Sequence, residues 1–140
     1  MLSDPLRKIA AEDGRYAAEA YQFVFECLEP AVLLAGRENC EGQERHVSGQ
    51  ELLAGMRAHA TDTFGPLAGH VWRSWGLKRT VDWGEIVFVL VRAGMLNRQE
   101  TDSVDDFRDG FDFDEAFVEG YELKLPPEIT ARPISGEGSN

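Results

Sequence analysis

The sequence predicts a mainly α-helical domain that ends in a small C-terminal β-hairpin or wing. In the first 94 residues, apolar residues recur every three or four positions, and Ser, Asp, Pro and Gly, which favour helix ends, separate these stretches. After Gly94 the pattern changes to short runs that alternate between apolar and polar residues. We expect one domain over residues 1–125 and a disordered Pro- and Gly-containing tail over residues 126–140.

Two helices are expected before residue 37. Asp4-Pro5 has the chemistry of a helix start, and the first helix should run to about Glu12. Asp13 can cap a second, longer helix that should end at Gly36. Pro30 lies inside this second pattern and lacks a backbone N–H, so it predicts a kink or a break there. The apolar face of the second helix contains Ala17, Ala20, Tyr21, Val24, Phe25 and Leu28.

Two further helices follow a polar loop at residues 37–47. Ser48-Gly49-Gln50-Glu51 has the spacing of a capping box, which predicts a helix start. Gly65-Pro66 ends that helix and begins the next one, because proline is favoured at the first helical position. Gly76 ends this helix, and Leu77 fits the apolar contact that accompanies a glycine cap.

Residues 86–91 are apolar on every side, so they fit either a helix or a buried strand. A cap at Thr80 or Asp82 and a terminator at Gly94 favour the helix, and the strand remains the alternative. In either form this element should be central. Met95–Gln99 is a candidate strand, and Asp109-Gly110 between alternating aromatic residues predicts the hairpin. Helices followed by a hairpin also match a winged-helix-like layout.

The chain is acidic, with a formal net charge of −11. Residues 97–140 hold 12 acidic and 4 basic residues, so the acidity belongs to the C-terminal third. A field of this sign disfavours nucleic acid and attracts basic partners. The N-terminus lacks the pattern of a secretory signal, and no run of about 18 apolar residues occurs, so we expect a soluble cytoplasmic protein that does not bind membranes.

No catalytic, cofactor-binding or metal-ligating residue is predicted. The spacing of Cys27, Cys40 and His46 matches no zinc motif, and the C-terminal aspartates do not place the ligands of an EF-hand loop. Standard nucleophile and phosphate-binding motifs are also missing from the sequence. Asp82 and Glu85 can share a helix face as paired carboxylates, but a capping role accounts for them. Free thiols are expected at both cysteines, with a disulfide as the alternative.

Two features are candidates for a partner-binding surface. Three tryptophans fall within twelve residues around a turn, so one ring edge can be exposed as an anchor for a protein. Burial of all three in the core is the alternative. The acidic hairpin can meet a basic partner. The candidate partner-binding residues are therefore Trp72, Trp75, Trp83, Asp109 and Asp112, and the partner is another protein or a second copy of the chain.

Several strings resemble those of a family of short uncharacterised bacterial proteins. They are Arg45-His46-Val47-Ser48-Gly49-Gln50-Glu51-Leu52, Phe64-Gly65-Pro66-Leu67-Ala68, Trp75-Gly76, Asp82-Trp83-Gly84-Glu85-Ile86-Val87-Phe88, Asp106-Phe107 and Asp112-Phe113. The resemblance covers about residues 16–117. Because that family has no assigned activity, ligand or partner, the resemblance implies no site residue here.

The leading hypothesis is a non-catalytic regulatory or protein-interaction domain. The runner-up is a degenerate winged-helix protein that binds nucleic acid through basic residues near the third and fourth helices. Acidic Asp82 and Glu85 at the start of the expected reading helix oppose that hypothesis. An enzyme of unrecognised type is the third candidate. The basic residues concerned are Arg73, Lys78, Arg79, Arg92 and Arg98.

Overall fold

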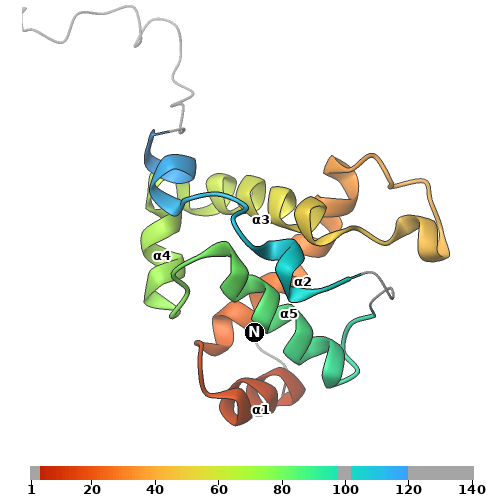
Figure 1. The fold of residues 1–140 in the computed structure, drawn as a ribbon, viewed down its shortest axis with the longest axis horizontal. Coiled ribbons are helices and arrows are strands. Elements are labelled where there is room, and N and C mark those ends of the chain that lie inside the picture. The colour runs from red at the N-terminus through yellow and green to blue at the C-terminus, as the bar shows by residue number, and fades with distance from the viewer. Residues whose placement is uncertain (1–3, 98–101, 120–140) are drawn as a thin grey trace, which may run out of the picture.

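The computed structural model of the chain describes residues 4–97 and 102–119. This part of the chain is mainly helical and contains no strand (Figure 1). The α-helices are α1 (Asp4–Asp13), α2 (Ala18–Leu34), α3 (Gly49–Phe64), α4 (Ala68–Ser74) and α5 (Thr80–Arg92). Short helical turns connect or follow them: η1 (Gly42–Arg45), η2 (Gly65–Leu67), η3 (Val104–Phe107) and η4 (Glu115–Glu119).

The predicted cap begins α3, but the predicted cap of α5 at Thr80 or Asp82 is wrong, because Arg79 occupies the cap position and Asp82 is the third helical residue. The Ser48 hydroxyl accepts a hydrogen bond from the Glu51 N–H at 3.0 Å, and the Glu51 carboxylate accepts one from the Ser48 N–H at 2.9 Å. This bond from Ser48 holds the pKa of the Glu51 carboxyl below its usual range. The Asp82 carboxylate accepts from the N–H groups of Lys78 and Arg79 at 2.8 and 3.1 Å. Residues 86–91 are helical, so the strand alternative is wrong.

Of the kink or break predicted at Pro30, the break is wrong, because α2 continues through it to Leu34. Gly36, with φ 75°, ends the helix as expected, and the Arg37 N–H bonds to the Val32 carbonyl at 3.0 Å. Packing against α3 explains the continuity. Gly55 lies so close to α2 that a Cβ there would be 2.6 Å from the Ala31 Cα, and Ala31 is fully buried. This contact holds the residue that follows the proline in the helix.

The prediction that Asp13 caps α2 is wrong. The α2 cap position is Ala17, whose side chain makes no capping hydrogen bond. The Asp13 carboxylate instead accepts hydrogen bonds from the Tyr21 hydroxyl and from the Arg15 guanidinium. It therefore ties the α1–α2 connection to the first turns of α2.

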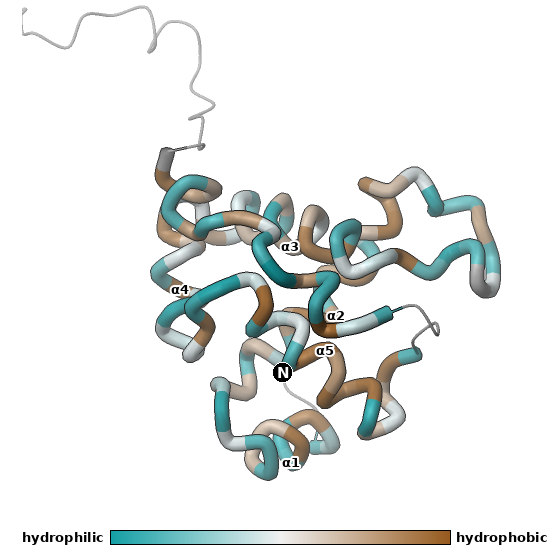
Figure 2. Tube along the Cα trace, in the orientation of Figure 1, coloured by the Kyte–Doolittle hydropathy of each residue, from teal (hydrophilic) through white to brown (hydrophobic). Residues whose placement is uncertain are grey.

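The core lies where α2, α3, α4 and α5 meet the C-terminal segment. α5 packs against α1, α2 and η3, and Figure 2 shows apolar residues running along it. The segment of residues 102–119 passes from α5 to the turn η2 and to α4 (Figure 1). Within the described residues, no helix has both the length and the apolar character needed to cross a membrane.

The C-terminal hairpin is absent from the described residues, which contain two short helical turns there instead. Thr80 explains the difference: its buried hydroxyl donates to the Phe107 carbonyl at 2.6 Å and accepts from the Gly110 N–H at 2.9 Å. These backbone groups would otherwise be free for strand pairing. The candidate strand Met95–Gln99 is not formed at residues 95–97, which are neither helix nor strand. Residues 98–99 and the predicted tail at 126–140 lie outside the described residues.

Replacing Thr80 with valine should therefore destabilise the fold. Thr80→Val keeps the shape of the side chain but leaves the Phe107 carbonyl and the Gly110 N–H without their partner. We expect the free energy of unfolding in urea to fall by about 1–3 kcal/mol. Thr63→Val, at an exposed position of α3, is the matched control and should change it by less than about 0.5 kcal/mol. Equal effects of the two substitutions would contradict the role given to Thr80.

Candidate functional site

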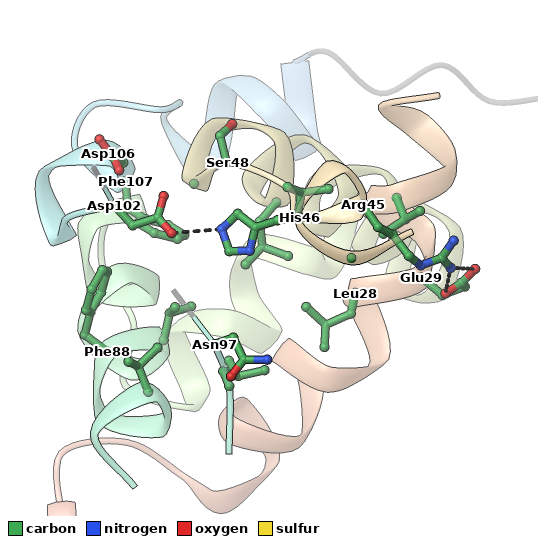
Figure 3. Close-up of a pocket in the computed structure, with 18 residues that line it drawn as sticks. Leu28, Glu29, Arg45, His46, Ser48, Phe88, Asn97, Asp102, Asp106 and Phe107 are labelled. Atoms are coloured by element: carbon green, nitrogen blue, oxygen red, sulfur yellow. Dashed lines mark hydrogen bonds and ion pairs between the residues drawn. The ribbon is translucent and has the colours of Figure 1, made fainter. Parts of the chain in front are cut away.

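An open hollow of about 1160 Å³ lies between α2, α3, α5 and the segments that precede α3 and η3 (Figure 3). Its walls combine an apolar floor with a polar rim. The floor is made by Leu28, Val32, Val47, Leu52, Val87, Phe88, Val91, Leu96 and Phe107. The rim carries Glu29, Arg45, His46, Ser48, Asn97, Asp102 and Asp106.

Four apolar residues of the floor keep part of their surface open to solvent. Leu28, Val47, Val91 and Leu96 are half-buried, whereas the other floor residues are buried. They come from α2, from the loop before α3, from α5 and from the bend after α5. Exposed apolar surface that converges on one concave site is typical of a binding site, because a ligand that covers it removes that surface from water.

His46 and Asp102 form a hydrogen-bonded pair in the hollow. The His46 Nε2 lies 2.8 Å from an Asp102 carboxylate oxygen, and their side chains are 22% and 17% exposed. Figure 3 shows the His46 ring directed toward the Asp102 carboxylate. A neutral imidazole that donates its Nε2–H to the carboxylate keeps a lone pair on Nδ1. No described residue bonds to that nitrogen.

Phe107 fixes the wall that carries Asp102 and Asp106. Its ring lies between two helices at positions without a side chain: a Cβ on Gly49 or on Gly84 would be 2.9 Å from it. The Gln50 side-chain amide also donates to the Asp106 carbonyl. The segment of η3 is therefore fastened to α3 and α5, and this placement holds Asp102 opposite His46.

Arginine side chains fix the opposite rim. Arg45 donates to both carboxylate oxygens of Glu29 at 2.9 Å and to the Glu38 carbonyl at 2.8 Å. Arg37 donates to the Glu51 carboxylate at 3.1 Å and to the Glu44 carbonyl at 3.0 Å. Through these bonds both arginines hold the loop of residues 37–47 against α2 and α3.

The candidate tryptophans lie together in the core, outside the hollow. Trp72 and Trp83 are fully buried, with ring centroids 5.1 Å apart, so neither offers a ring edge to a partner. Trp75 is half-buried, and its ring lies 6.5 Å from that of Trp83. Only Trp75 therefore keeps the exposure that a surface anchor needs.

The candidate aspartates are exposed but do not line the hollow. The Asp112 carboxylate accepts from the N–H groups of Asp114 and Glu115 at 3.0 and 3.1 Å, which caps the turn that leads into η4. Asp109 has a φ of 55° and makes the bend between Phe107 and Phe111. In the predicted hairpin, Asp109 and Asp112 would lie on one surface that faces a basic partner. In the structure they belong to separate turns.

Sequence reasoning missed His46 and Asp102, which are 56 positions apart and belong to no common motif. Both cysteines are free; Cys27 is buried, and burial raises the pKa of its thiol. In the described part of the chain, no cluster of three His, Cys, Asp or Glu residues is arranged to hold a metal ion. No family model, curated protein or solved structure matches the chain.

The His46–Asp102 pair should couple energetically. In a double-mutant cycle with His46→Ala and Asp102→Ala, we expect a coupling free energy of about 1 kcal/mol or more in urea unfolding at pH 7, because the bond is charge-assisted and partly buried. The exposed pair Arg108–Asp105, whose side chains are 55% and 77% exposed, is the comparison and should couple by less than about 0.5 kcal/mol. A coupling near zero for His46–Asp102 would remove it as a fixed element of the hollow.

Gly84→Ala should loosen the wall of the hollow. Alanine favours a helix over glycine by about 1 kcal/mol, but the new Cβ would overlap the Phe107 ring, which Gly49 confines from the other side. We expect a net loss of about 1–3 kcal/mol in unfolding free energy and faster amide exchange over residues 102–107. Gly69→Ala, whose nearest atom would be 3.3 Å away, should cost less and leave that exchange unchanged.

Proposed function

We propose that this chain is a non-catalytic protein-interaction domain that binds a segment of its partner in the hollow. The observation that carries the proposal is the convergence of Leu28, Val47, Val91 and Leu96 on one open, concave site. Their exposed apolar surface is backed by buried side chains of α2, α3 and α5, so the floor is firm. Apolar anchors of a bound segment gain most from such a surface.

The size of the hollow favours a protein segment over a small molecule. Sites for small molecules usually have volumes of about 300–1,000 Å³ and enclose most of the ligand. The hollow, at about 1160 Å³, exceeds that range and is open to solvent. A segment that lays several side chains into a groove between helices fits this shape better.

The other candidate functions have less support. A winged-helix nucleic-acid binder needs a basic surface, but the hollow carries Asp102 and Asp106, and Arg73 is paired with Asp114 at 3.0 Å. An enzyme is favoured by one observation, the His46–Asp102 pair, because a neutral imidazole oriented by a carboxylate can remove a proton. Turnover of a bound molecule that is lost in His46→Ala would favour the enzyme.

Site-specific photo-crosslinking tests the proposal. A photo-reactive benzoylphenylalanine replaces Leu96 in the hollow or, as the matched control, Leu67 on η2, which is 64% exposed. In the native cell, we expect a nuclease-resistant crosslink to one protein from position 96 and not from position 67. Leu28→Gln should reduce that crosslink by about tenfold, because it places a polar group among the apolar anchors.

Leu34→Gln provides the second control, since Leu34 is on the same helix, is 59% exposed and does not line the hollow. It should leave the crosslink unchanged. Equal crosslinking from positions 96 and 67, or equal loss in Leu28→Gln and Leu34→Gln, would overturn the proposal. Crosslinks to nucleic acid that nuclease removes would favour the winged-helix alternative instead.

A further inference from the structure

The carboxylates on the rim of the hollow offer hydrogen-bond acceptors to a ligand. His46 is bonded to Asp102 through Nε2, and its Nδ1 is an acceptor in the neutral form of the imidazole. Glu29, with a side chain 65% exposed, and Asp106 present carboxylate oxygens, each of which has more than one acceptor site. Arg45, the arginine of the rim, already donates to Glu29 and Glu38. A ligand that complements these groups must bring donors.

The surroundings of the hollow add negative charge. The described segment 102–119, whose residues 102, 106 and 107 line the hollow, holds eight acidic residues and one basic residue, Arg108. Arg108 is itself paired with Asp105 at 2.9 Å. The opposite rim carries Glu29. Among the charged residues that line the hollow, the carboxylates of Glu29, Asp102 and Asp106 outnumber Arg45, and a concave site with an excess of one sign of charge attracts ligands of the other sign.

We infer that the partner segment combines apolar side chains with at least one Lys or Arg, and that this cation is held by the acceptors of the rim. The inference rests on the proposed function and names the chemistry of the partner. A second copy of the chain fits less well, because each copy carries a net charge of −11 and the two would repel each other. Phosphate-bearing ligands meet the same repulsion.

Selection from a library of random displayed peptides tests this inference. The full chain is the target, and peptides that also bind Leu28→Gln are removed by counter-selection. We expect the remaining peptides to be enriched in apolar residues together with Lys or Arg. Their affinity, measured by fluorescence anisotropy, should fall about tenfold in Glu29→Gln/Asp106→Asn, as expected for the loss of charge-assisted contacts.

The control variant changes the net charge by the same amount outside the hollow. Glu12 and Glu19 are exposed residues of α1 and α2 that do not line it, so Glu12→Gln/Glu19→Gln should alter affinity less than twofold. In the test variant, the asparagine oxygen can still accept the Ser103 N–H bond that Asp106 now accepts at 2.9 Å. The wall should therefore stay in place.

Three outcomes would overturn the inference. Equal losses of affinity in the two charge variants would show attraction by the whole acidic surface. Hollow-dependent peptides without Lys or Arg would leave the proposed function standing and reject only the partner chemistry. If no selected peptide depends on Leu28, and Leu96 gives no crosslink in the cell, the proposed function fails as well.

Discussion

The aromatic cluster around Trp72 is the interaction on which the rest of the structure depends. The ring of Trp72 meets Phe113, Phe117 and Trp83 edge to face, with centroids 4.9–5.1 Å apart, and so joins α4, α5 and the C-terminal segment. Neither buried indole N–H has a hydrogen-bond partner among the described residues. Leaving such a donor unpaired costs about 1–3 kcal/mol, whereas burying 150–250 Å² of tryptophan surface contributes about 4–6 kcal/mol. The free energy gained by burying the rings therefore exceeds the cost of the unpaired N–H groups, and these tryptophans stabilise the core.

That cluster also determines where a binding site can form. The first half of α5 contributes Trp83 to the cluster and Thr80 to the anchor of the C-terminal segment. The second half contributes Val87 and Val91 to the floor of the hollow. Because the same helix contributes to the core and to the floor, packing of the core also fixes the position of the floor. Phe107 packs against Gly84 of this helix and so fixes the wall that carries Asp102.

The sequence predicted the helices because their boundaries are local. The Ser48 capping box and the terminators Gly36 and Gly76 act within a few residues, and all three are present in the fold. The break at Pro30 does not occur, and the contact that explains this comes from Gly55 of another helix, which the local sequence does not show. The Asp109-Gly110 pair was misinterpreted because Thr80 takes the neighbouring backbone groups. The mainly helical fold class was accessible from the sequence, whereas the predicted hairpin is absent from the described residues.

The residues that form the hollow could not be predicted from the sequence, because they meet only through packing contacts. Gly49, Gly84 and Phe107 belong to separate strings of the chain, and their link is a packing contact: the two glycines leave room for one ring. Once Phe107 is seated there, the residues before it are placed across from the loop that carries His46, and a pair of unremarkable polar residues becomes a feature of one site. Each residue alone fits an ordinary surface position. Only their juxtaposition, which the glycine contacts produce, gives the rim its acceptor character and distinguishes a binding site from a solvated face.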